Sequence, residues 1–374
     1  MPALEPLAAV HVEAIELVTV PMRLAVPMRT AGGRRDHRDV LLVHVQAAEA
    51  DGWAECPVEA EPTYGPEFTR AAGLVLRDHL VPRAWAGPTG DALALGPALD
   101  AVRGHPMARA ALELAVLDAQ LRAADRSLAS WLGATASTVR PGAALGLHDD
   151  VEGLLAEADE AIRAGAARLR VKIAPGRAAD PLEALRAHVG PEMLLQADAN
   201  GSFAEDDAEL DRLDAVGLSC LEQPLAPADL LGHARLAARL ATPICLDEPM
   251  TSLAAVEAAV ALGACEVLCL KPARVGGWIA ARAVHDRCVE LGVPVWIGGM
   301  LETGVGRAAN LAVAALPHLA LPPDLDPRGR FAADLADPRR PVDGLVRVPS
   351  SPGTGAEPDP DLLADAEVMR VLRP

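Results

Sequence analysis

The chain has 374 residues, of which 51% are hydrophobic and 23% are charged, a composition typical of globular proteins. That length suits two domains or one large domain. The formal net charge of −18 repels the phosphates of nucleic acids and anionic membrane surfaces. Aromatic residues make up only 2% of the chain, so base-stacking platforms are not expected. We therefore expect neither nucleic acid nor a membrane as a partner.

The N-terminus and the cysteines point to a cytoplasmic protein. The first 20 residues lack a basic start followed by a long apolar core, so no signal peptide is expected. No apolar run approaches the roughly 18 residues that a membrane helix needs. The six cysteines form no C-x-x-C pair, and we expect buried, reduced thiols.

The N-terminal third combines strand and helix patterns. Residues Val12–Val20 and Val40–Val45 are rich in β-branched side chains and predict strands. The segment 27–35 between them is rich in Gly and Arg, has no helical or strand period, and predicts a loop. Residues Glu67–Asp78 and Pro106–Ala124 predict helices. This third therefore predicts an α+β region.

From about Pro141 onward, short apolar runs alternate with Ala-rich helical stretches. Nearly continuous apolar runs are typical of parallel strands that are covered on both faces. Eight such strands in fewer than 200 residues favour a closed (β/α) barrel over an open sheet. The eight runs are Ala143–Leu147, Leu169–Ile173, Met193–Asp198, Leu218–Glu222, Pro243–Asp247, Val267–Lys271, Val293–Ile297 and Leu319–Leu321.

Five successive runs carry a charged residue at or near their C-terminal ends. These charged residues recur every 24 to 26 positions, the length of one βα unit. Isolated charged residues at strand ends are usually solvated, but five at nearly constant spacing are hard to explain in that way. Barrel active sites form at this rim, so the pattern predicts an active site. The five residues are Lys172, Asp198, Glu222, Asp247 and Lys271.

The three carboxylates in this series predict a metal site. Converging carboxylates repel one another and raise each other's pKa values unless a cation lies among them. Asp and Glu offer the hard oxygen ligands that Mg²⁺ prefers, and without His or Cys partners zinc is less favoured. We therefore predict Asp198, Glu222 and Asp247 as ligands of Mg²⁺, with Mn²⁺ as the alternative.

The two lysines in the series predict an acid/base pair. Of the 34 basic residues, only Lys172 and Lys271 are lysines, and the rest are arginines. Lys, unlike Arg, can lose its proton at accessible pH. Both lysines flank the carboxylates in strand order. The arrangement predicts removal of a proton α to a substrate carboxylate, with the metal stabilising the negative charge that develops.

With these residues in view, the chain resembles the enolase superfamily over nearly its whole length. It is similar to the muconate-lactonising subgroup, and within it to the o-succinylbenzoate synthase / N-succinylamino acid racemase branch. The stretch Gly298–Arg307, GGMLETGVGR, is the most specific for that branch. The segments that carry the resemblance are Gly52–Cys56, Glu61–Tyr64, Lys172–Gly176, Gln196–Asn200, Leu221–Pro224, Leu246–Pro249 and Gly298–Arg307.

The resemblance implies an α/β fold, a modified TIM barrel (β/α)7β with an N-terminal α+β capping domain. The expected divisions are a capping domain over 1–135, a barrel over 136–325, and a segment 326–374 that returns to the capping domain. Segment 27–35 would be a mobile active-site loop that closes over substrate. Members of the family often form dimers or octamers, so a homo-oligomer is expected.

The resemblance also implies roles for individual residues. Lys172 would be the base, or both acid and base. Lys271 would be the second base in a racemisation, or a cation beside the enolate in a dehydration. Arg170 stands where the family usually has a lysine, so it keeps a positive charge but cannot transfer a proton. Ala144 stands where the branch often has a serine. The expected substrate contacts are Arg170, Asn200, Gly298, Gly299, Met300 and Leu301.

The resemblance thus implies a lyase or isomerase that acts on a small-molecule carboxylate. We expect o-succinylbenzoate synthase, a dehydratase of menaquinone biosynthesis, with N-acylamino acid (N-succinylamino acid) racemase as the alternative. Another cycloisomerase or epimerase of the muconate-lactonising type is a further possibility. A non-catalytic binding protein is least favoured because the series of charged residues is intact. For four further residues two alternatives stay open, a role at the site or a solvated or salt-bridged position. They are Glu248, Glu302, Arg34 and Arg35.

Overall fold

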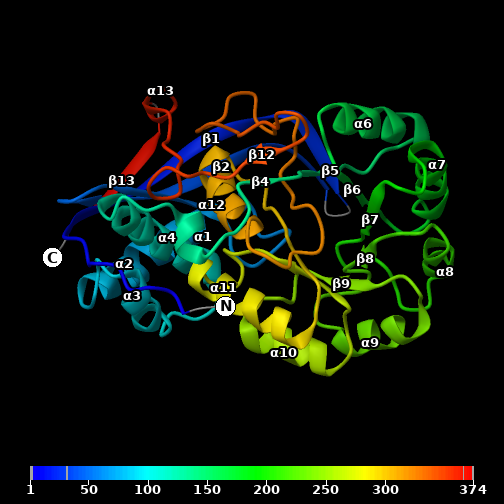
Figure 1. Cartoon of the computed structure of the whole chain (residues 1–374), viewed down its shortest axis with the longest axis horizontal. Helices are drawn as coiled ribbons and strands as arrows, with labels where there is room; N and C mark the ends of the chain where they lie inside the picture. The colour runs from blue at the N-terminus through cyan, green and yellow to red at the C-terminus, as the bar shows by residue number, and fades with distance from the viewer. Residues whose placement is uncertain (1–2, 31–32, 365, 373–374) are drawn as a thin grey trace.

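A computed structural model describes residues 3–30, 33–364 and 366–372. These residues form an antiparallel four-stranded sheet with its own helices and a parallel seven-stranded sheet wrapped by helices (Figure 1). In Figure 1 strand β13 and helices α2 and α3 lie at the opposite end of the molecule from helices α6 to α8, and β1 and β2 run from there toward β5. Among the described helices, none is long and apolar enough to span a membrane.

The antiparallel sheet has the strand order β13-β1-β2-β3, so the two ends of the chain share one sheet. Helix α4 packs against β3 and β2 and is buried along most of its length, because the sheet and neighbouring helices cover it. The elements here are β1 (Val12–Thr30), β2 (Gly33–Ala47), β3 (Gly52–Cys56), α1 (Thr69–Val75), the π-helix η1 (Leu76–Leu80), α2 (Val81–Trp85), α3 (Ala92–Leu99), α4 (Pro106–Ala123), α5 (Leu128–Leu132) and β13 (Glu367–Leu372).

Segment 27–35, expected to be a loop, is strand in the structure at all of its described residues. Its two arms pair in the register Met28↔Arg35 and Arg29↔Arg34, which extends the β1–β2 ladder. Backbone pairing has therefore overridden the weak strand propensity of a Gly- and Arg-rich segment. Ala31 and Gly32 lie outside the described residues. The mobility expected for this segment stays a prediction.

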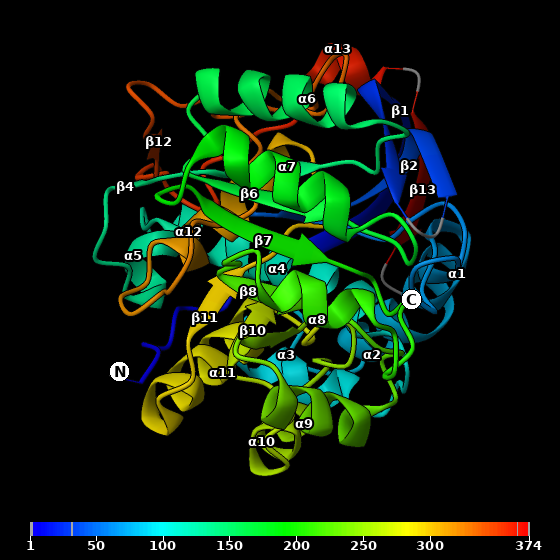
Figure 2. The ribbon, with the colours of Figure 1, turned by 90° about the vertical axis from the view of Figure 1, so that its right-hand side faces the viewer.

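The parallel sheet has the order β11-β10-β9-β8-β7-β6-β5, and helices cover its outer face (Figure 2). The eighth predicted run and the residues directly after it form single bridges in place of a strand. Val295 pairs with Leu319 and Gly142 pairs with Asp324, which joins the last strand to the first. The modified barrel fold is thereby confirmed. Its elements are β5 (Gly142–Leu145), α6 (Val151–Arg163), β6 (Arg168–Lys172), α7 (Ala179–Val189), β7 (Leu194–Asp198), α8 (Glu209–Asp214), β8 (Cys220–Glu222), α9 (Leu230–Arg239), β9 (Ile244–Leu246), α10 (Leu253–Ala261), β10 (Val267–Leu270), α11 (Trp278–Leu291), β11 (Val295–Ile297) and α12 (Gly304–Ala314).

Local sequence fixes where several barrel helices begin. The side chain of Asp150 accepts a hydrogen bond from Gly153 N at the start of α6. The side chain of Ser252 accepts a hydrogen bond from Ala255 N at the start of α10. These caps satisfy backbone N–H groups that the first turn leaves free, so they set the lengths of the βα loops at the rim.

The C-terminal segment crosses from the barrel back to the antiparallel sheet. Strand β12 (Val346–Arg347) pairs with β4 (Thr138–Val139), and after α13 (Pro360–Leu363) strand β13 pairs antiparallel with β1. This pairing ties the two sheets together through the end of the chain.

Small and sulfur-containing side chains fill the barrel interior below the rim. A buried cluster joins Cys220, Cys245 and Cys269 to Trp296, and the Arg168 guanidinium stacks over the Trp296 ring at 4.1 Å. All six cysteines are buried and free of disulfides, as expected for reduced thiols.

The close approach of β3 to α4 depends on Gly52. A Cβ at this position would overlap the carbonyl oxygen of Ala115 and lie 2.5 Å from Ala119 N, both of them backbone atoms that cannot swing away. We predict that Gly52→Ala lowers the free energy of unfolding by about 2–3 kcal/mol, measured by chemical denaturation. Gly73→Ala is the matched control, since Gly73 lies in helix α1 with open space around it and should gain up to about 1 kcal/mol. Equal stability of the two variants would contradict this packing.

Candidate active site

The structure brings the five predicted charged residues to one rim of the barrel. Lys172, Asp198 and Glu222 are the last residues of β6, β7 and β8, and Asp247 and Lys271 directly follow β9 and β10. In the sheet Lys172 is the register partner of Asp198, and Asp198 is the partner of Glu222. The three carboxylate residues are completely buried. The lysines therefore flank the carboxylates from the two sides, as their spacing predicts.

One half of the site is organised around Asp198. Lys172 Nζ donates to Asp198 Oδ2 at 2.6 Å and to Asn200 Oδ1 at 2.7 Å. Arg170 donates to Asp198 and reaches both oxygens of Glu222 at 3.2 Å. Its other terminal nitrogen donates to Asp324. The Arg170 guanidinium thus lies between two carboxylates and offsets their repulsion.

The other half of the site is organised around Asp247. Lys271 Nζ donates to Asp247 Oδ2 and to the Tyr64 hydroxyl, each at 2.8 Å. Arg274 donates to Asp247 and, at 2.7 Å, to the Tyr64 hydroxyl, which in turn donates to Asp247 Oδ2 at 2.8 Å. Burial disfavours the charge on Lys271, but Asp247 and Tyr64 outweigh burial and hold the lysine's pKa well above its usual value. Lys271 is therefore an ammonium ion in this arrangement.

The carboxylates have the character of a metal site. Burial, with added repulsion from Asp198 and Asp247, raises the pKa of Glu222 to about 8 even though Arg170 opposes the shift. A carboxyl group with so high a pKa indicates that the buried cluster still lacks positive charge. Oxygen donors of this kind suit a hard divalent cation such as Mg²⁺. The residues present therefore fit the predicted ion.

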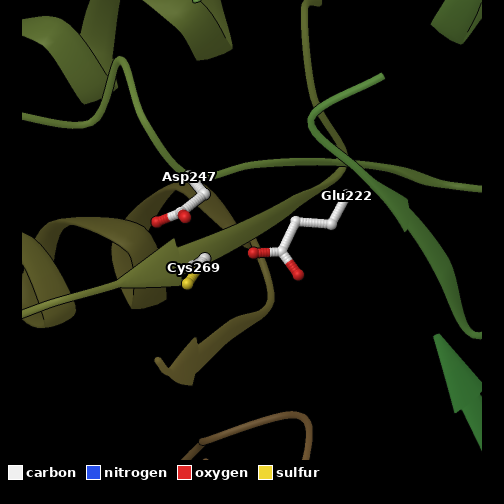
Figure 3. A group of neighbouring side chains, drawn as sticks. All are labelled: Glu222, Asp247 and Cys269. Carbon is white, nitrogen blue, oxygen red and sulfur yellow. The ribbon is translucent and has the colours of Figure 1, made fainter. Parts of the chain in front are cut away.

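The tightest cluster of potential ligand atoms in the structure shares two of its three residues with the predicted ligand set. The described residues whose potential ligand atoms lie within 4.8 Å of one another are Glu222, Asp247 and Cys269 (Figure 3). Asp198 is drawn instead to Arg170 and Lys172. Burial raises the pKa of the Cys269 thiol well above its usual value, and a protonated thiol is a poor ligand for a hard cation. Asp198 stays the predicted third ligand.

A cavity of about 290 Å³ opens over these residues. Both lysines line it, as do five of the six predicted substrate contacts: Arg170, Asn200, Gly299, Met300 and Leu301. Glu302 and Arg35 also reach it, and Arg35 pairs with Glu59 at 2.5 Å. Gly298 and Arg34 are not among the described residues that line it. Gly298 instead packs behind Lys271, where a side chain would collide with the Lys271 stem.

The capping region holds the rim loop 298–303 in place. Arg38, almost fully buried, donates to Leu301 O, to Glu55 Oε1 at 3.1 Å and to Val58 O at 3.0 Å. Glu55 Oε2 accepts from the backbone N and the hydroxyl of Thr303 at 2.9 and 2.7 Å. Leu301 has a φ of 58°, which is unfavourable for a residue with a side chain. We attribute this conformation to the Arg38–Glu55 clamp.

Sequence reasoning missed several residues of the site. Tyr64 is the only tyrosine in the chain, and the same compositional argument that singled out the lysines would have found it. Arg274 is three positions after Lys271 and gave no separate signal. Asp324 comes from the Pro-rich segment after the eighth predicted run and binds both Arg170 and Arg168. Glu248 is mostly buried, and its Oε1 accepts from Asn200 Nδ2 at 2.9 Å, so it adjoins the site.

Gly298 allows a direct test of how Lys271 is positioned. An added Cβ would overlap Cys269 Sγ and lie 2.9 Å from Lys271 Cε. We predict that Gly298→Ala lowers kcat about 100-fold, because the added Cβ would displace the amine of Lys271 by up to about 1 Å. In a Cys269→Ala/Gly298→Ala double variant the sulfur overlap is gone but the lysine overlap remains. The loss of kcat should therefore persist relative to Cys269→Ala alone, and full recovery would contradict the proposed contact.

Comparison with known proteins agrees with this geometry. A family model described as "Enolase C-terminal domain-like" matches residues 153–362. An N-succinylamino acid racemase from an Amycolatopsis species is 43% identical over 359 residues, covering 96% of this chain and 98% of the relative. An o-succinylbenzoate synthase from Geobacillus kaustophilus is 38% identical over 355 residues, 94% of each chain.

Solved structures extend the likeness to three dimensions. A crystal structure of an enolase superfamily member from Listeria innocua has a TM-score of 0.92 and 32% identity over 98% of this chain and 100% of that one. A muconate lactonizing enzyme from Pseudomonas fluorescens has a TM-score of 0.88 at 24% identity over 96% of this chain and 99% of that one, which shows the same fold. The matched model, the relatives and the structures together show that the chain belongs to the enolase superfamily.

Proposed function

We propose that the protein is a Mg²⁺-dependent enzyme that removes the proton α to a carboxylate of a small-molecule substrate. One observation carries this proposal. The only two lysines of the chain enter a single cavity from the two flanks of three buried carboxylates. Two amines in such positions can act on opposite faces of a substrate carbon held between them.

The metal would be held by Asp198, Glu222 and Asp247. When bound there, it would supply positive charge that stabilises the negative charge developing on the substrate carboxylate. Asn200, Met300 and Leu301 would contact the rest of the substrate. Since Arg38 fixes the backbone of Leu301, the cavity wall is held in place before substrate arrives.

Two reactions follow from the same first step, in which an amine takes the α-proton and the electron pair of the broken C–H bond moves into the carboxylate as an enolate. In a dehydration, that pair returns to form a C=C bond while the β C–O bond breaks. The departing hydroxide takes a proton from the lysine ammonium and leaves as water. In a racemisation, the opposite ammonium returns a proton to the other face of the α-carbon. Both steps balance without a further reactant.

We propose dehydration of the o-succinylbenzoate synthase type as the principal activity, as in the relatives at 38% identity. N-succinylamino acid racemisation is the second candidate. It is supported by the relative at 43% identity and by the second lysine, Lys271, which enters the cavity from the flank opposite Lys172. Assembly as a homo-oligomer, a cytoplasmic location and the alternative use of Mn²⁺ stay predictions.

The lysines provide the test. We predict that Lys172→Arg, which keeps the charge but cannot act as a base, lowers turnover by about 10²–10⁴-fold. Lys271→Arg should lower the rate of racemisation by a similar factor. The arginine then present on that face of the substrate cannot give up its proton at accessible pH. Water loss from the cyclohexadiene acid can be followed by ultraviolet absorbance. Inversion of N-succinylamino acids can be followed by polarimetry, with proton exchange in D₂O.

Arg287→Lys, an exposed exchange of one cation for another away from the cavity, is the control and should leave both reactions unchanged. If Lys172→Arg and Lys271→Arg each kept full turnover, the acid/base assignment would be wrong. Persistence of α-proton exchange in Lys271→Arg with loss of inversion would support two bases acting on opposite faces.

A further inference from the structure

A second cavity, separate from the one at the barrel rim, is lined mainly by arginines. It has a volume of about 470 Å³ and shares none of its lining residues with the rim cavity. Three guanidinium groups and one carboxylate give its lining a net charge of +2, in a chain whose net charge is −18. The described residues that line this arginine cavity are Asp337, Pro338, Arg339, Arg340 and Arg347.

The three arginines are not neutralised within the described part of the chain. The side chains of Arg340 and Arg347 are exposed and have neither a hydrogen-bond nor an ion-pair partner there. Arg339 is half-buried, its Nη2 donates to the carbonyl oxygen of Gly355, and its buried Nε has no partner among the described residues. Burial lowers the pKa of Arg339, although Asp337 opposes the shift. A partly desolvated guanidinium in this state is costly unless an anion joins it.

The backbone holds these arginines in place before any ligand arrives. Asp334 Oδ1 accepts from Gly304 N at 2.6 Å, which ties the segment before the cavity to the start of α12. Arg339 has a φ of 51°, which is unfavourable for a residue with a side chain. Arg347 is fixed from another direction, because it pairs with Thr138 of β4. A binding site whose groups are already ordered loses less entropy when its ligand binds.

The charge of the arginine cavity indicates the class of ligand. A phosphate monoester carries a charge of about −1.5 to −2 at pH 7 and has three terminal oxygens that accept strong hydrogen bonds. Both features match a lining with a net charge of +2 and three guanidinium groups. A single carboxylate would balance only half of that charge. Arginine also presents its N–H groups in a planar fork that suits phosphate oxygens.

We propose that the arginine cavity binds a phosphoryl group, either as free phosphate or as part of a small phosphate monoester. The terminal oxygens would accept hydrogen bonds from Arg339, Arg340 and Arg347. This site goes beyond the proposed reaction, and its existence does not depend on that reaction because the two cavities have no lining residue in common.

Calorimetric titration of the full chain at low salt, with Mg²⁺ present, tests the proposal. We expect inorganic phosphate and phenyl phosphate each to bind at one site per chain with a dissociation constant of about 1 mM or lower. Acetate should bind at least about 10-fold more weakly, and added salt should weaken phosphate binding because it screens the charges. Equal affinity for the two phosphates would show that the phosphoryl group alone is recognised, whereas tighter binding of phenyl phosphate would show that the cavity also holds an organic part.

Variants locate the site. Arg340→Gln and Arg347→Gln should each weaken phosphate binding about 10-fold, and the double variant about 100-fold, because each change removes a charge-assisted hydrogen bond. Both side chains are exposed and make no contacts that folding requires, so these variants should fold as the wild type does. The matched control is Arg70→Gln in α1, since Arg70 is also exposed and without an ion-pair partner among the described residues but lies outside the cavity.

Three results would overturn the inference. The first is the absence of saturable phosphate binding to the wild type, and the second is acetate binding as tight as phosphate binding. The third is unchanged phosphate affinity in the Arg340→Gln/Arg347→Gln double variant, which would place the bound ion elsewhere, for example among the cations of the rim cavity.

Discussion

The site depends above all on one electrostatic constraint, the burial of three carboxylates at the ends of adjacent strands. Asp198, Glu222 and Asp247 are shielded from water, so their mutual repulsion cannot be relieved by solvent. Burial together with this repulsion raises the pKa of Glu222 to about 8, so the surrounding protein cations offset the two effects only in part. Arg170 and Arg274 supply fixed charge, and the two lysines supply charge that can also move as protons. The proposed divalent cation would complete the balance.

The capping region makes this charged rim into a shaped cavity. Tyr64 reaches down to join Asp247, Lys271 and Arg274 in one hydrogen-bonded group. Arg38 holds Leu301 in a conformation that the loop would not adopt readily by itself. In the proposed reaction, proton transfer would take place at the barrel rim, while the capping region and the rim loop would determine which substrate fits.

Features of the fold and the site were predictable where they leave a local pattern in the sequence. Features that depend on contacts between distant residues were not. Parallel barrel strands are apolar on both faces, and the five charged residues at their ends repeat with the βα unit, so the barrel and the rim followed from the sequence. Asp324 and Arg38 act through partners more than 150 and 250 positions away in the chain, which no local pattern encodes. Segment 27–35 has no strand period, yet its residues 28–30 and 33–35 pair because β1 and β2 continue past their apolar parts. Arg274 left no local signal, because its contacts with Asp247 and Tyr64 are tertiary.

The central claim is that the three carboxylates form one Mg²⁺ site, and calorimetric titration of the metal-free protein with Mg²⁺ tests it most directly. We predict one ion per chain, with affinity lowered about 100-fold or more in each of Asp198→Asn, Glu222→Gln and Asp247→Asn, since each removes a charged ligand. Cys269→Ser should bind as the wild type does. The claim would be contradicted if the wild type bound no ion, or if Cys269→Ser lost affinity while Asp198→Asn kept it.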